Sequence, residues 1–323
     1  MNDVATQERM KPSLDFVTIT ERAALAASHW MGRGERDIAD GAAVEAMRAA
    51  LGEMEISGRI VIGEGERDEA PMLFIGEEVG CGGPAVDIAV DPVEGTNLVA
   101  NGLPNSIAVM AIAPRGGLLH APDSYMEKLA VGPKAAPHVH IDASVQENLA
   151  AVARALEKPI GDICVVILDR PRHGELIEQV RSAGARIKLI SDGDVDACIA
   201  TAVPGTGIHV AMGTGGAPEG VLAAAAIKCL GGNFMGRLEP RNPEEAERAK
   251  AMGFGDLGRV LTIDDLAKGE NVIFCATGIT DGDLVRGVRF FGNNARTHSI
   301  VMHSDGTVRF IESVHRLAAR PRR

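Results

Sequence analysis

The segment that decides the fold of this chain is Asp91-Pro92-Val93-Glu94-Gly95-Thr96. The residues that lead into it, Ala85 to Asp91, alternate apolar with small or acidic side chains, which predicts a β-strand ending in an acidic turn. Pro92 fixes the turn that leaves this strand, so we expect Asp91 and Glu94 to converge on one point.

The end of the same segment favours the start of a helix. Gly95 permits a close approach of the backbone. Thr96 then has its hydroxyl group where it can orient an attacking water molecule, if the neighbouring carboxylates hold a metal ion. Taken alone, this short motif is as consistent with a solvated turn as with a metal site.

Three further groups of carboxylates lie at the ends of predicted strands or the starts of predicted helices. They are Asp40, then Glu64, Glu66, Asp68 and Glu69, and finally Glu219. These loops carry no matching lysines, so their charges need a counter-ion. Mg²⁺ and Mn²⁺ prefer oxygen ligands, and the four groups together therefore predict a site for one of these ions.

The glycine-rich loop from Gly213 to Gly220 supports two interpretations. A dinucleotide-binding loop needs glycine at position 218, where this chain has proline. Pro218 instead suits the first position of a helix, whose free N–H groups bind anions. Glu219 then lies in the first turn of that helix, where it can reach a metal ion.

Composition bounds the remaining choices. The chain has 323 residues with 46% hydrophobic and only 3% aromatic content, which allows one large core, or two packed domains, built from aliphatic side chains. A net charge of −11 argues against a nucleic-acid binder.

The five cysteines are widely separated and are expected to be buried and reduced. The first residues contain no apolar stretch of a signal peptide, and no apolar run is long enough for a membrane span, so we expect a cytoplasmic protein.

The order of predicted elements favours sheets covered by helices. A helix is expected from the capping-box spacing Thr18 to Glu21, and another from about Asp37 to Met54. The remaining predicted elements are strands at 59–62, 85–91, 106–113, 162–168, 186–190 and 208–212, helices from 144, at 174–182, from 195 and at 218–230, and an antiparallel end at 285–314 with Asp305-Gly306 as a hairpin turn.

Two other polar groups follow predicted strands. Arg170-Pro171-Arg172 either pairs with Asp169 or uses its guanidinium groups to bind phosphate. Asp192-Gly193-Asp194 either holds sugar hydroxyls or caps a helix.

Ile88-Ala89-Val90-Asp91-Pro92-Val93-Glu94-Gly95-Thr96 resembles the metal motif of the lithium-sensitive, Mg²⁺-dependent phosphatases. With the segments Ile62 to Met72, Tyr125 to Leu129 and Gly215 to Gly220, it makes the chain similar to the class II fructose-1,6-bisphosphatases of the GlpX type. The resemblance runs from about Ile19 to about His315. It implies an α/β fold, an α-β-α-β-α layered sandwich of two packed subdomains.

The resemblance also implies roles for individual residues. Metal ligands are expected at Asp40, Glu64, Asp91, Glu94 and Glu219, with Thr96 and Asp68 in catalysis. Substrate contacts are expected from Glu94, Gly95, Thr96, Tyr125, Arg170, Pro171, Arg172, Asp192, Gly193, Asp194 and Gly216. Arg36 and Arg170 stand where relatives often carry lysine, so phosphate contacts there are expected to be bidentate.

The implied activity is metal-dependent hydrolysis of the 1-phosphate of fructose 1,6-bisphosphate, a step of gluconeogenesis and the Calvin cycle. Parts of the motifs resemble the cyanobacterial branch, which also acts on sedoheptulose 1,7-bisphosphate. Alternatives are an inositol-phosphate phosphatase, a dinucleotide-dependent enzyme using Gly213 to Gly220, and an inactive sensor of sugar phosphates.

The expected organisation is an N-terminal arm at 1–16, a metal-binding catalytic subdomain at 17–140, a second α/β subdomain at 141–316 that completes the substrate site, and a basic tail at 317–323. The expected partners are a sugar bisphosphate and further copies of the chain, as a dimer or tetramer, without nucleic acid or membrane.

Overall fold

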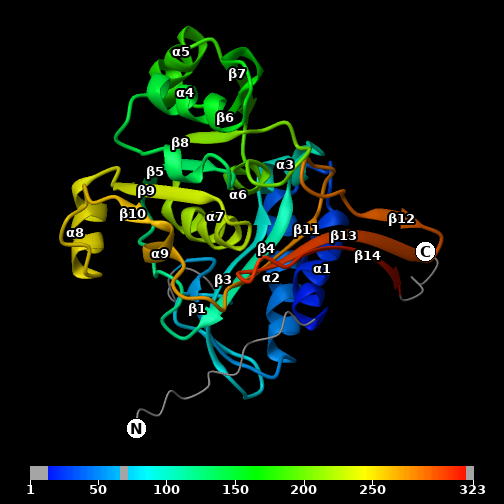
Figure 1. Ribbon diagram of the computed structural model, residues 1–323. Helices are drawn as coiled ribbons and strands as arrows, with labels where there is room; N and C mark the ends of the chain where they lie inside the picture. The colour runs from blue at the N-terminus through cyan, green and yellow to red at the C-terminus, as the bar shows by residue number, and fades with distance from the viewer. Residues whose placement is uncertain (1–13, 66–71, 318–323) are drawn as a thin grey trace.

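The structure is a computed structural model that describes residues 14–65 and 72–317. Two mixed β-sheets dominate it (Figure 1). The strands of the first sheet are β1 Ser57–Ile62, β2 Glu78–Val79, β3 Ala85–Glu94, β4 Ile107–Pro114, β11 Ile273–Gly278, β12 Arg289–Phe291, β13 Asn294–His303 and β14 Val308–Arg316. They follow the order β12-β13-β11-β4-β3-β1-β2, with β14 paired to β13.

The second sheet is built from the middle of the chain. Its strands are β5 Tyr125–Val131, β6 Cys164–Leu168, β7 Arg186–Ile190, β8 Val210–Gly216, β9 Asn233–Glu239 and β10 Leu261–Thr262, in the order β10-β9-β5-β8-β6-β7. The first sheet therefore takes strands from both ends of the chain, and the predicted division at residue 140 does not coincide with the change of sheet. The subdomain boundaries stay a prediction.

Helices cover both sheets and separate them (Figure 1). The helices α1 Leu14–Ser28 and α2 Arg36–Gly52 pack on the outer face of the first sheet. Between the sheets lie α6 Asp194–Ala200 and α7 Ala217–Cys229. On the outer face of the second sheet lie α4 Val145–Ala155 and α5 Gly174–Ser182. This order of layers is α-β-α-β-α, as predicted. The shorter or peripheral helices are α3 Thr96–Asn101, α8 Pro243–Ala251 and α9 Ile263–Leu266.

The helix α7 shows why a chain with so few aromatic residues forms this sandwich. Its side chains are buried on all sides, including the run Ala223 to Ala226. A helix that is apolar all round has to be covered on every face, and α7 is covered by both sheets. Alanine lets the sheets approach closely, and the strands β3 and β4 that α7 covers are almost wholly buried.

Local sequence signals located most elements well. The helix at 174–182 and the strand at 186–190 have the predicted bounds, α4 has a complete capping box at Ser144 and Glu147, and Asp305-Gly306 lies in the turn between β13 and β14. Three expectations were wrong. Thr18 lies inside α1, Pro218 is the second residue of α7, and β3 continues through Pro92 to Glu94.

The cysteines fit the prediction in part. All five are free, and Cys198, Cys229 and Cys275 are buried, but Cys81 is exposed and Cys164 is half-buried. Within residues 14–65 and 72–317, no helix combines the length and apolar character needed to cross a membrane.

Candidate metal centre and active site

A cavity of 290 Å³ opens at the end of β3. It is lined by all of the carboxylates that the resemblance assigned to metal, namely Asp40, Glu64, Asp91, Glu94 and Glu219. Gly95, Thr96 and Asp192 line it as well. The structure therefore brings these five carboxylates to one cavity, while their roles as ligands stay a prediction.

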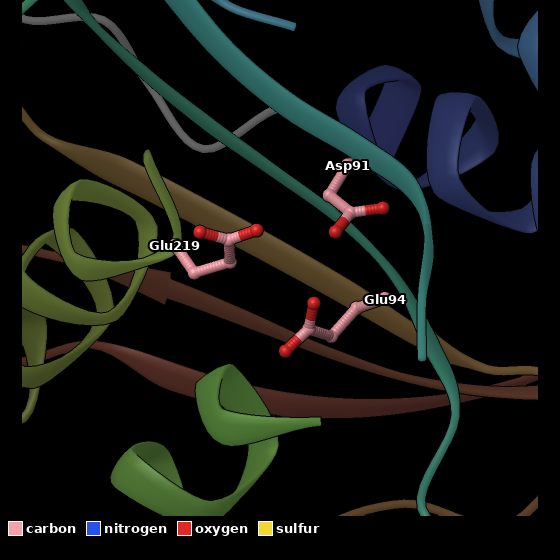
Figure 2. Close-up of side chains that lie close together, drawn as sticks. All are labelled: Asp91, Glu94 and Glu219. Atoms are coloured by element: carbon pink, nitrogen blue, oxygen red, sulfur yellow. The ribbon is translucent and has the colours of Figure 1, made fainter. Parts of the chain in front are cut away.

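Each carboxylate comes from a different local structure. Asp40 lies on α2, and Glu64 lies in the loop after β1. Asp91 and Glu94 come from β3, whose pairing with β4 shifts register between these two residues. Glu219 projects from the first turn of α7. Figure 2 shows Asp91, Glu94 and Glu219 directed into a common space. The cavity thus joins an outer helix, the first sheet and the middle helix.

The register shift explains why Asp91 and Glu94 share one site. In a regular strand, residues three apart point to opposite faces of the sheet. Here the N–H group of Val93 donates to Asp91 Oδ1 at 3.0 Å, and Gly95 takes a left-handed conformation with φ of 80° before α3 begins. Pro92 does not end the strand, and the predicted turn is replaced by an irregularity within β3.

The carboxylates crowd one another. One oxygen from each of Asp91, Glu94 and Glu219 lies within 4.8 Å of the other two. Burial raises the pKa of Asp91 to about 7. Burial, and then the charges of Asp91 and Asp40, raise the pKa of Glu64 to about 8. Burial, and then the charge of Asp91, raise the pKa of Glu94 well above its usual range. The cluster is therefore unstable as a set of bare negative charges.

This site fits a hard divalent cation. Glu219 Oε2 is buried and has no hydrogen-bond partner. A hard divalent cation would coordinate this unpaired carboxylate oxygen together with the other carboxylate oxygens around it. Asp91, Glu94 and Glu219 would hold the ion, and Glu64 and Asp40 line the same cavity for a second one.

Basic residues form a second cluster at the neighbouring strand ends. The Arg172 guanidinium lies 4.6 Å from the centre of the Tyr125 ring, and the Arg241 guanidinium lies 5.0 Å from it. Arg172 also donates two hydrogen bonds to the Thr214 carbonyl, at 3.1 Å and 2.6 Å. Tyr125 pairs with Gly216, which caps the helix that carries Glu219. The basic cluster therefore adjoins the acidic cavity.

The remaining predicted substrate residues lie near these two clusters. Arg170 and Pro171 lead into the turn that carries Arg172, and Arg170 donates to the Asp169 carbonyl. Asp192 accepts a hydrogen bond from Asn97, and Gly193 caps α6 with φ of 85°. Asp194 forms an ion pair with Lys128. Asp68, together with Glu66 and Glu69, lies outside the described residues.

Two residues of this region were missed in the sequence. Lys128 is buried on β5 between Met126 and Ala130, and the alternation of that strand places all three on one face. That pattern was a usable signal. Arg241 gave no such signal, because it reaches Tyr125 only through the pairing of β5 with β9.

The glycines of the Gly213 to Gly220 loop make room for side chains of this chain. A Cβ atom on Gly216 would lie 1.9 Å from Glu219 Oε2, and one on Gly215 would lie 2.0 Å from Asp194 Oδ2. The space that a dinucleotide-binding loop leaves for its ligand is filled here by two carboxylates.

We expect a divalent ion to stabilise the folded protein. Mn²⁺ at roughly 100 times its dissociation constant contributes about 2.7 kcal/mol, which corresponds to a rise in melting temperature of roughly 5 °C. The measurement is thermal unfolding of protein treated with chelator, with and without Mn²⁺, and with NaCl of equal ionic strength as control. Equal melting temperatures with both salts would contradict a metal site.

Comparison with known proteins bears on this geometry. The model of the family described as bacterial fructose-1,6-bisphosphatase, glpX-encoded, matches residues 10–315. A protein of Synechococcus sp. (strain JA-2-3B'a(2-13)) is 51% identical over 94% of this chain and 95% of its own length. Proteins of Trichodesmium erythraeum and Microcystis aeruginosa are 49% and 50% identical, with the same shares covered. All three are named D-fructose 1,6-bisphosphatase class 2/sedoheptulose 1,7-bisphosphatase. The chain therefore belongs to the glpX-encoded family of bacterial fructose-1,6-bisphosphatases.

Proposed function

We propose that this protein is a phosphoric monoester hydrolase that removes the 1-phosphate of fructose 1,6-bisphosphate, with Mg²⁺ or Mn²⁺ bound. The observation that carries the proposal is the convergence of five carboxylates on one cavity beside a cluster of guanidinium groups. The first cluster suits a cation that neutralises a reacting phosphate, and the second suits a phosphate that does not react.

The residues of the cavity have distinct tasks in this proposal. A divalent ion bound here would supply a water of lowered pKa and neutralise charge on the transferred phosphoryl group. Asp91, Glu94 and Glu219 would hold that ion, and Thr96, the first residue of α3, would orient the attacking water with its hydroxyl group. Because phosphoryl transfer depends mostly on positioning and electrostatics, this set is sufficient for the chemistry.

The basic cluster fixes the other end of the substrate. This cluster is centred on Tyr125, whose ring contacts Arg172 and Arg241. In the sheet, Tyr125 pairs with Gly216, the residue that precedes the helix carrying Glu219. Arg172 lies over the tyrosine ring and uses Nε and Nη2 to donate to the Thr214 carbonyl, so its Nη1 group is the one proposed to donate to the second phosphate. Asp192 and Asp194 are proposed to accept hydrogen bonds from the sugar hydroxyl groups that lie between the two phosphates of the substrate.

Sedoheptulose 1,7-bisphosphate is the second proposed substrate, because the relatives at about half identity carry both activities in their names. It presents the same 1-phosphate and one more carbon before the distal phosphate. We further propose that the protein is cytoplasmic, since the proposed substrates are phosphorylated sugars of central metabolism, and that it forms a dimer or a tetramer. Light scattering on the purified protein tests the oligomeric state.

We expect phosphate release from fructose 1,6-bisphosphate in the presence of Mg²⁺ or Mn²⁺, and none above background with chelator. The assay measures inorganic phosphate beside parallel reactions with sedoheptulose 1,7-bisphosphate and inositol 1-phosphate. Turnover of inositol 1-phosphate alone, or metal-independent release, would contradict the proposal.

A further inference from the structure

Lys128 has an unusual position. Its side chain is 4% exposed, and among the lysines and arginines that the structure describes it is the only one that is buried. It lies on β5 and faces the middle layer of the sandwich, in line with Met126 and Ala130. An ammonium group is costly to bury unless it is paired.

The partner of Lys128 is Asp194. Lys128 Nζ donates to Asp194 Oδ2 at 2.6 Å. Burial alone would lower the pKa of Lys128, but the charges of Asp194 and Glu219 outweigh it, so that the pKa is raised and the group stays charged.

The backbone around this pair is shaped to contain it. Gly215 on β8 lies against the pair, and a Cβ atom there would be 2.0 Å from Asp194 Oδ2 and 3.1 Å from Lys128 Nζ. A Cβ on Gly220, in α7, would come to 3.6 Å of Lys128 Cε. The ion pair therefore has a space of its own between β8 and α7.

Asp194 is also a neighbour of the acidic cluster. The N–H group of the next residue, Val195, donates to Glu94 Oε1 at 2.9 Å. The charge of Asp194 contributes to the raised pKa of both Glu94 and Glu219, although burial is the main cause for each. Nevertheless, the closely spaced ligand atoms belong to Asp91, Glu94 and Glu219, and Asp194 is not among them.

We propose that Lys128 is a positioning residue that keeps Asp194 out of the metal ligands and holds it for the substrate. The inference rests on the proposed function, because it needs a metal site. By engaging Asp194 Oδ2, Lys128 fixes the carboxylate against Gly215. Without that partner, Asp194 is a nearby anion with no counter-ion, and the divalent ion gains a further carboxylate ligand.

The test is a double-mutant cycle of Lys128→Met, Asp194→Asn and the two combined, read by calorimetric titration with Mn²⁺ alone. We expect Lys128→Met to tighten Mn²⁺ binding about tenfold, which is within the range of coupling between contacting residues. In the Asp194→Asn background, the same substitution is expected to leave Mn²⁺ affinity unchanged. Lys128→Met is also expected to raise KM for fructose 1,6-bisphosphate more than it lowers kcat.

Circular dichroism identifies variants that do not fold, and Lys128→Gln replaces Lys128→Met if the latter fails. Unchanged or weaker Mn²⁺ binding in folded Lys128→Met protein would overturn the proposal. So would equal tightening in both backgrounds, because Lys128 would then act directly by its charge. If the wild-type protein binds no Mn²⁺, the proposed function and this inference are both wrong. If the wild type binds Mn²⁺ but all variants of the cycle bind it with the same affinity, only this inference is wrong.

Discussion

Glu94→Gln is expected to lower kcat for fructose 1,6-bisphosphate roughly 10³-fold, the upper end of the loss seen when one preorganised charge-stabilising group is removed. Glu94 is buried, belongs to the closely spaced ligand atoms and accepts a hydrogen bond from Val195. Glutamine retains the size of the side chain and can keep that hydrogen bond, so the substitution removes mainly the ability of this side chain to become an anionic ligand for the metal ion.

The fold of this variant should not suffer. Burial and the charge of Asp91 already disfavour the charged form of Glu94 in metal-free protein, so an uncharged glutamine fits this position and we expect a melting temperature no lower than that of the wild type. Mn²⁺ should then raise the melting temperature less than it does in the wild type. Glu178→Gln, an exposed glutamate on α5, is the matched control and should change neither quantity. Activity of Glu94→Gln within tenfold of the wild type would contradict the ligand assignment.

Arg172→Met should lower kcat/KM for fructose 1,6-bisphosphate roughly 10- to 100-fold, mainly by raising KM. Hydrogen bonds to charged groups contribute about 1.5–3 kcal/mol each, and Arg172 is proposed to bind the phosphate that does not react. Methionine retains an apolar contact with the Tyr125 ring but donates no hydrogen bond.

A substrate without a distal phosphate separates this role from a structural one. With fructose 1-phosphate, the Arg172→Met variant and the wild type are expected to have the same kcat/KM. Arg181→Met, an exposed arginine at the end of α5, serves as the control. Equal losses with both substrates would show that Arg172 supports the fold of the site through the Thr214 carbonyl instead of binding phosphate.

Much of the fold could be predicted because it is encoded locally. The capping box at Ser144 and the turn at Asp305-Gly306 act over a few residues, and both were located in the sequence. The strands β9 and β11 were not predicted, although Phe234 and Leu238 alternate with more exposed residues in β9. The return of the chain to the first sheet at β11 depends on pairing with β4, and no local signal specifies a partner so distant in sequence.

The candidate site divides in the same way. Its carboxylates could be predicted because acidic residues beside glycine and proline at strand ends are poorly suited to packing. Lys128 is signalled only by the alternation of β5, in which it shares the buried face with Met126 and Ala130, and its charge works against a buried position. Arg241 depends on the neighbouring strand β9 and could be found only in three dimensions.

The distribution of the first sheet over both ends of the chain sets the order of events during synthesis. β4, the neighbour of the strand that carries Asp91 and Glu94, takes its second partner from Ile273–Gly278. Every residue of the second sheet is translated before that partner, so β4 keeps an open edge until the last part of the chain leaves the ribosome. The segment that closes this edge is thus among the last to be made.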